Sequence, residues 1–120
     1  MKLVSWNCRG LGNHAKIEAV KDLLKLEPAD ILLLQETKIP GHALLEISKT
    51  KWKKSAGKAV SARGSSGGLA TLWSEEKHQL IKSHETQHWI YTEISHLASK
   101  LKISLVNLYV PVTYSEKRDC

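Results

Sequence analysis

The order of apolar and polar positions in the first third of the chain predicts a strand–helix–strand unit. Residues 2–6 alternate in hydrophobicity as a short strand does, and residues 7–13 contain two glycines and two asparagines, which is typical of a loop. Residues 14–27 carry apolar side chains at helical spacing, with Asn13 before them as a candidate N-cap. Residues 29–36 contain a run of successive apolar positions, which predicts a strand covered on both faces. This order is compatible with a parallel pair of strands.

The rest of the chain has the pattern of a largely β structure. A loop with about one helical turn near residues 43–47 comes first, and a Gly- and Ser-rich loop lies at residues 63–68. Stretches rich in β-branched, aromatic or alternating residues predict strands at 58–62, 69–73, 78–84, 88–95 and 102–110, the last three joined by hairpin turns. We find no internal repeat and no linker of domain-boundary length. We therefore expect one α/β domain over residues 1–120, with a mixed sheet and few helices.

The end of the second predicted strand suggests a ligand site. Three leucines at residues 32–34 lead almost directly into Glu36, a carboxylate that is costly to bury without a partner. Asn7 ends the first strand, and the carboxyl ends of parallel neighbours open on the same edge, where α/β sheets bind ligands. Carboxylate and amide oxygens suit Mg²⁺ or Mn²⁺. Two simpler interpretations stay open: Asn7 as a turn residue, and Glu36 in an ion pair with Arg9 or Lys38.

Charge and cysteine content narrow the setting and the partner. The formal net charge is +6, with a pI near 9.4, which favours an anionic partner, with DNA or another nucleic acid as the first candidate. The alternative, that the charge serves only solubility, stays open. No apolar run approaches 18 residues, so we expect no membrane span, and the N-terminal residues do not resemble a signal peptide. Cys8 and Cys120 stand at opposite ends, which favours a reducing, intracellular location in the nucleus or cytoplasm.

Two further motifs compete for a functional role. His84-Glu85-Thr86-Gln87-His88 formally matches the H-E-x-x-H signature of zinc hydrolases. That chemistry needs a helix, and this stretch instead fits a hairpin turn between strands. A basic cluster around Trp52 could bind nucleic acid by charge and stacking, or could be a solvated surface whose tryptophan packs inward. The lysines of this cluster are Lys51, Lys53, Lys54 and Lys58.

Four sequence motifs, in order, carry a family resemblance. They are SWNCRGLGN at 5–13, LLLQETK at 32–38, SARGSSGGLATLW at 61–73 and LVNLYVP at 105–111. Together they resemble the N-terminal half of the endonuclease/exonuclease/phosphatase family, whose members include apurinic endonucleases. The first motif is most similar to the endonuclease domains of plant LINE-type retrotransposons. The resemblance implies part of a DNase I-like four-layer α/β sandwich, truncated relative to the family.

The resemblance also implies roles for individual residues. Asn7 matches an active-site asparagine that helps to orient the attacking water, and Glu36 matches the glutamate that binds the metal. Tyr109 matches a tyrosine that contacts the scissile phosphate. The glycines within residues 65–68 match a glycine-rich turn whose role is structural. Arg9 stands where many apurinic endonucleases have an aspartate, so any role of that aspartate in metal binding is not carried over.

The implied activity is Mg²⁺- or Mn²⁺-dependent hydrolysis of DNA, with RNA and small phosphoesters left open as substrates. The family's second half supplies Gly-Asp-x-Asn and Ser-Asp-His-type motifs, which none of the aspartates here matches: Asp22, Asp30 and Asp119. We therefore expect this portion to be inactive alone and to associate through an uncovered inner sheet face. The alternatives are a non-catalytic basic remnant that binds nucleic acid and, less favoured, the zinc hydrolase.

Overall fold

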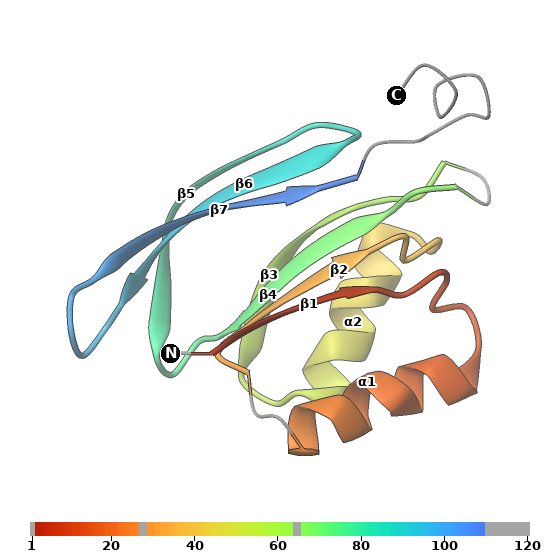
Figure 1. The fold of residues 1–120 in the computed structure, drawn as a ribbon, viewed down its shortest axis with the longest axis horizontal. Coiled ribbons are helices and arrows are strands. Elements are labelled where there is room, and N and C mark those ends of the chain that lie inside the picture. The colour runs from red at the N-terminus through yellow and green to blue at the C-terminus, as the bar shows by residue number, and fades with distance from the viewer. Residues whose placement is uncertain (1, 27–28, 64–65, 110–120) are drawn as a thin grey trace, which may run out of the picture.

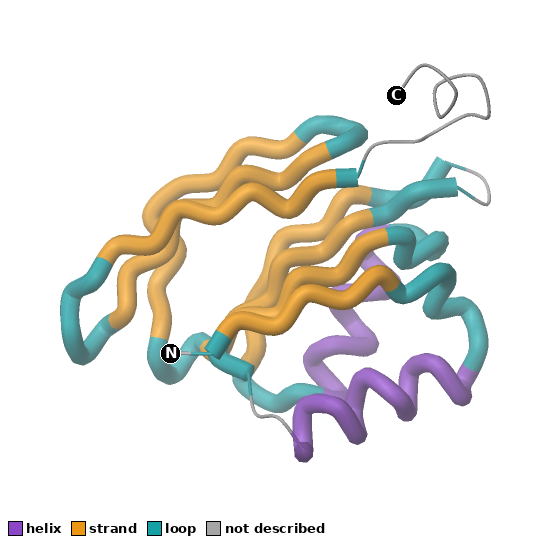
Figure 2. The backbone as a smooth tube through the Cα atoms, viewed as in Figure 1, coloured by secondary structure: helices purple, strands orange, loops and turns teal. Residues whose placement is uncertain are grey.

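Two β-sheets packed face to face, with two helices on the outside of the first, make up the protein (Figure 1). The computed structural model describes residues 2–26, 29–63 and 66–109. Its layers run from helices to a four-stranded sheet to a three-stranded sheet (Figure 2). This arrangement confirms the α/β class with a mixed sheet and few helices. No helix in the described ranges is long and apolar enough to cross a membrane.

The predicted strand–helix–strand unit forms at the N-terminus. β1 (Leu3–Asn7) pairs in parallel with β2 (Ile31–Gln35), in a register that runs from Leu3 opposite Ile31 to Asn7 opposite Gln35. α1 (His14–Leu26) connects the two strands. Asn13 caps this helix as expected, because its Oδ1 accepts a hydrogen bond from the backbone N–H of Lys16 at 2.9 Å.

The segment after β2 is more helical than the sequence indicated. α2 (Gly41–Lys51) replaces the single turn expected near residues 43–47. The prediction was wrong because the helix is stabilised by packing: Leu44 is buried in the core and Leu45 packs against it, a tertiary contribution that local propensity does not report. β3 (Ser55–Val60) also begins three residues earlier than position 58.

The two sheets have different connectivity. β4 (Leu69–Ser74) runs antiparallel to both β2 and β3, which gives the first sheet the order β1-β2-β4-β3. β5 (His78–Glu85), β6 (Trp89–His96) and β7 (Lys102–Leu108) form an antiparallel meander. The three predicted hairpin-linked strands are therefore confirmed.

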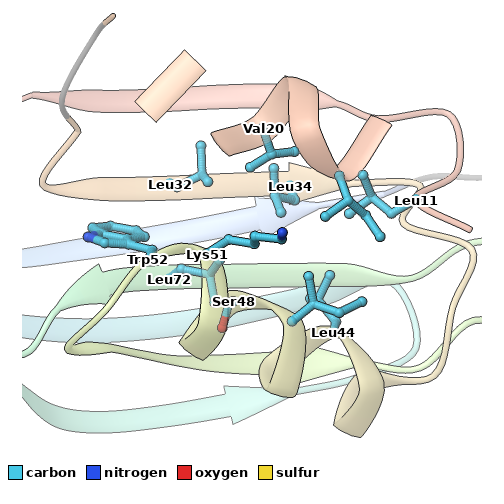
Figure 3. A pocket seen from close by; sticks show the side chains of 11 residues that line it. Leu11, Val20, Leu32, Leu34, Leu44, Ser48, Lys51, Trp52 and Leu72 are labelled. Carbon is cyan, nitrogen blue, oxygen red and sulfur yellow. The ribbon is translucent and has the colours of Figure 1, made fainter. Parts of the chain in front are cut away.

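Two apolar clusters explain why β2 is apolar on both faces. One cluster lies between the helices and the first sheet and includes Leu32 and Leu34, together with Leu44 of α2. Figure 3 shows side chains from both helices and the sheet that line a pocket in this layer. The volume of this pocket is about 30 Å³. The other cluster lies between the sheets and includes Ile31 and Leu33. Alternate residues of one strand thus belong to different cores, as expected for a sheet covered on both sides.

The uncovered face is not the one we expected. The chain supplies strands of both sheets, so the inner face of the first sheet is covered by the second, and Ile103 and Leu105 of β7 pack between them. The prediction of an open inner face was therefore wrong. Among the described residues, the second sheet has no helix on its outer face (Figure 1), and Val106 and Leu108 are 59% and 54% exposed there.

Candidate functional site

The carboxyl ends of β1 and β2 bring the first two predicted site residues together. Asn7 lies opposite Gln35 at the end of the parallel register. Beyond the strands, the N–H of Cys8 donates to the carbonyl of Gln35 at 2.8 Å, and the N–H of Gly10 donates to the carbonyl of Glu36 at 2.7 Å. The segments that follow β1 and β2 therefore stay paired past the sheet, which holds Asn7 and Glu36 at neighbouring positions on one edge.

The carboxylate of Glu36 has no protein partner within the described ranges. The residue is half-buried and adopts a left-handed backbone, with φ of 52°, a conformation that non-glycine residues seldom take. Its carboxylate makes neither a hydrogen bond nor an ion pair with any described residue, so the expected alternative of a pair with Arg9 or Lys38 is not formed. A strained, half-buried carboxylate without a cation fits a ligand site better than a structural role.

Of the two roles that the sequence left open for Asn7, the structure shows the turn interaction. Its side-chain Oδ1 accepts a hydrogen bond from the backbone N–H of Arg9 at 3.2 Å, which is a turn interaction. A carbonyl oxygen has two lone pairs, so this bond leaves one for a further contact. The side chain is exposed, and it lies next to the segment that carries Glu36.

A glycine turn connects the Glu36 segment to Tyr109. The N–H groups of Thr37 and Lys38 donate to the carbonyls of Gly68 and Gly67, at 3.2 Å and 2.9 Å. Both glycines have positive φ, 79° at Gly67 and 95° at Gly68. A Cβ atom on Gly67 would lie 3.6 Å from Cε2 of Tyr109, so the ring packs over this glycine. The structural role expected for the glycine-rich turn is thus visible in its geometry, and it places Tyr109 on the same edge as Glu36.

A buried asparagine that the sequence analysis missed supports this edge from below. Asn107 on β7 is 1% exposed, and its Oδ1 accepts a hydrogen bond from the side-chain amide of Gln35 at 2.9 Å. Its Nδ2 donates to the carbonyls of Leu34 and Ala70, at 3.2 Å and 2.8 Å. The signal was present in the sequence, because Asn107 occupies an inward position of an alternating apolar strand, where an amide needs partners.

The donor set at this edge is small but of the right chemistry for a hard cation. Glu36 and Asn7 offer a carboxylate and an amide oxygen, and magnesium in proteins is commonly held by one or two carboxylates plus waters and substrate phosphates. No cluster of three or more His, Cys, Asp or Glu side chains able to share a metal occurs in the part of the chain that the structure describes. The residues present therefore fit a weakly held Mg²⁺ or Mn²⁺ and do not form a closed metal cage.

The fold contradicts the zinc-hydrolase interpretation, because the H-E-x-x-H motif is not on a helix. His84 and Glu85 are the last residues of β5, and His88 lies in the turn before β6, so no helix stacks the two histidines. The ring of His84 instead packs against Trp89, with centroids 5.0 Å apart.

The basic cluster and the first cysteine are also explained by packing. Trp52 is half-buried and packs against the core between helices and sheet, and two lysines of the cluster form ion pairs, Lys51 with Glu18 at 2.9 Å and Lys54 with Glu76 at 3.4 Å. Burial raises the pKa of the Cys8 thiol to about 12, so the free thiol is protonated at neutral pH. Cys120 lies outside the described residues.

A family model and solved structures of known proteins match this chain. Residues 4–114 match the model of the Endonuclease/Exonuclease/phosphatase family, which is most of the chain. The chain belongs to the endonuclease/exonuclease/phosphatase family. No curated protein sequence matches it.

Solved structures share the fold at low sequence identity. An AP endonuclease from Leishmania major is 20% identical with a TM-score of 0.67, over 92% of this chain and 40% of the other. The APE2 catalytic domain from Xenopus laevis is 20% identical with a TM-score of 0.68, over 99% and 48%. A mannosyl-6-phosphatase from Bacteroides thetaiotaomicron is 10% identical with a TM-score of 0.76, over 98% and 54%. The chain thus spans about half the length of the family structures it matches.

Proposed function

We propose that this chain is the N-terminal portion of a Mg²⁺-dependent phosphodiesterase that acts on DNA, of the type found in plant LINE-type retrotransposons. The observation that carries the proposal is the half-buried carboxylate of Glu36, which lies beside Asn7 and lacks a partner among the described residues. The retroelement type is supported by the wording of the first motif, SWNCRGLGN. DNA as the substrate is supported by the +6 charge and by the similarity to an AP endonuclease.

In this proposal the chain's own residues hold and orient the reacting phosphate. Glu36 and Asn7 would hold a divalent cation through their oxygens, aided by phosphate oxygens of the substrate. A bound divalent cation would polarise the phosphoryl oxygen and stabilise the leaving oxygen. Tyr109 is held over the glycine turn by a bond from its N–H to the carbonyl of His88 at 2.7 Å, and its hydroxyl group would contact the phosphate.

We further propose that these 120 residues alone do not hydrolyse DNA. Hydrolysis needs a group that activates water, and such groups typically contribute about 10²–10⁴-fold in rate. Asp30 is not such a group, because it precedes β2 at the opposite end of the sheet and is bonded to the backbone N–H of Lys2 at 2.7 Å. Purified chain should therefore fail to nick supercoiled plasmid in Mg²⁺. Nicking that Glu36→Ala abolishes would show that the residues present suffice.

The second candidate is a non-catalytic basic remnant that binds nucleic acid by charge alone. Anisotropy of a fluorescent DNA duplex, titrated at several Mg²⁺ concentrations, separates the two. We expect Mg²⁺ to strengthen binding by the wild type relative to Glu36→Gln, because only the wild type can couple cation and phosphate. Glu46→Gln, an exposed change on α2, is the matched control, since it alters net charge equally away from the site. Identical Mg²⁺ responses in all three proteins would favour the remnant.

A further inference from the structure

We infer that a small pocket beside Tyr109 binds a second phosphate of the nucleic-acid strand, next to the phosphate at the metal edge. The pocket has a volume of about 120 Å³. None of its lining residues is acidic, and they are Arg63, Ser66, Gly67, Gln87, His88 and Tyr109. The identity of the ligand as a strand phosphate rests on the proposed function, whereas the pocket itself does not.

Arg63 is held in place by a residue of the turn between β5 and β6. Its Nε donates to Oε1 of Gln87 at 2.9 Å, and Nε2 of Gln87 donates to the carbonyl of Ser61 at 3.4 Å. The backbone N–H and carbonyl of Arg63 both bond to Ser66, at 2.8 Å and 3.0 Å. Both the backbone and the side chain of Arg63 are therefore fixed by hydrogen bonds, although the residue is exposed.

The two terminal nitrogens of Arg63 are available for a ligand. No described residue accepts a hydrogen bond from either of them, and no described carboxylate pairs with the guanidinium group. A guanidinium whose Nε is already engaged presents its remaining N–H groups in the planar geometry that matches phosphate oxygens. Because Gln87 fixes its orientation, less side-chain entropy is lost on binding than for a free surface arginine.

The pocket shares Tyr109 with the candidate site. Tyr109 lines it, and its ring packs over Gly67, the glycine whose carbonyl accepts from Lys38 two residues after Glu36. A strand whose scissile phosphate lies at Glu36 and Tyr109 would thus place a neighbouring phosphate within reach of Arg63. This arrangement would fix the position of the strand along the edge, and the contact would not depend on the base sequence.

The pocket can be tested without metal, so that its failure is distinguishable from failure of the metal site. Amide and side-chain N–H signals should be followed by NMR during titration with inorganic phosphate in chelator. We expect shifts at Arg63 Nε–H, Gln87 and Tyr109, and about tenfold weaker binding in Arg63→Gln. Lys53→Gln, which removes the same charge at the opposite end of β3, should bind as the wild type does.

A second variant separates an oriented pocket from a simple positive charge. Gln87→Leu keeps the charge of Arg63 and removes the acceptor that orients it, so binding should weaken nearly as much as in Arg63→Gln. Phosphate binding equal to wild type in Gln87→Leu, or shifts centred on other residues, would overturn the inference. With a single-stranded oligonucleotide, Arg63→Gln should also lower the salt slope by about one charge, and Lys53→Gln should not. Equal slopes in the two variants would contradict the assignment to a strand phosphate.

Discussion

The side-chain amide of Gln35 donates a hydrogen bond to Oδ1 of Asn107 over 2.9 Å, and this bond joins the two sheets directly beneath the candidate site. Gln35 precedes Glu36, and Asn107 stands two residues before Tyr109. The bond therefore fixes the spacing between the residue proposed to hold the cation and the residue proposed to contact the phosphate.

Asn107→Ala should lower the free energy of unfolding by about 1–3 kcal/mol, because it removes the hydrogen bonds from β7 to the side chain of Gln35 and to the carbonyls of Leu34 and Ala70 in the first sheet. Asn107→Asp should cost at least as much, since it removes the donors and buries a charge. Urea unfolding followed by circular dichroism measures the effect. Ser104→Ala is the control, an exposed position on the outward side of the same strand. Equal stability in Asn107→Ala and Ser104→Ala would contradict the proposed inter-sheet role.

Gly68→Ala should destabilise the protein by more than about 1 kcal/mol, because alanine at φ 95° is strained. In addition, its Cβ would collide with Oγ1 of Thr37. Gly12→Ala should be nearly neutral, since no atom lies within 4 Å of the added methyl group. Thermal unfolding of both variants compares a required glycine with a tolerant one. A Tm for Gly68→Ala matching that of Gly12→Ala would show that the turn can relax.

Stability should fall on mild acidification because of His78. This residue is 2% exposed, its Nδ1 lies 3.3 Å from the carbonyl of Ser74, and its Nε2 has no partner among the described residues. Burial lowers its pKa, with the nearby His96 acting in the same direction. The unfolded state therefore binds more protons, and stability present above the unfolded pKa of about 6.5 is lost as the pH falls below it.

Urea unfolding at about pH 7.5 and about pH 5.5 measures this loss, because these two values lie above and below the ordinary histidine pKa. His78→Gln should lose less stability between the two values than the wild type, and His42→Gln, at an exposed position, should behave as the wild type does. Asp30 does not interfere, because its pKa is lowered by the hydrogen bond from the Lys2 N–H, so its contribution persists until the pH falls below about 3.8. Equal losses in wild type and His78→Gln would contradict the assignment.

The outer face of the second sheet should promote self-association. Val106 and Leu108 are exposed there on an edge strand, and exposed apolar edge strands favour pairing with another chain. Size-exclusion chromatography over a range of concentrations should show a shift to larger species. Val106→Lys should reduce this shift, and Ser104→Lys, which adds the same charge without removing apolar surface, should reduce it less. A concentration-independent monomer in the wild type would contradict this prediction.

Local patterns predicted the elements better than they predicted the layers. The parallel β1–β2 pair, the Asn13 cap and the β5–β6–β7 meander follow from period, capping and turn chemistry, which act over a few residues. The length of α2 and the division of the strands between two sheets depend on contacts across the whole chain. A sequence period shows that a face is apolar, but it does not show which layer covers it.

The candidate site shows the same division. Asn7 and Glu36 could be placed on one edge from the sequence, because the ends of parallel strands coincide. The alternation of β7 marks Asn107 as an inward amide that needs partners, but neither its bond to Gln35 nor the Arg63–Gln87 pair could be predicted, since these contacts join residues 72 and 24 positions apart. Only the packed structure shows that they converge on Tyr109.

Paramagnetic broadening by Mn²⁺ tests the proposed metal site most directly. In a titration followed by NMR, signals of Glu36 and Asn7 should broaden first, before those of His84 and His88, and inorganic phosphate should strengthen the effect because it supplies further oxygen ligands. Glu36→Gln should abolish the selective broadening, and Glu46→Gln should retain it. Broadening that starts at the histidines, or that persists unchanged in Glu36→Gln, would contradict a divalent-cation site at the ends of β1 and β2.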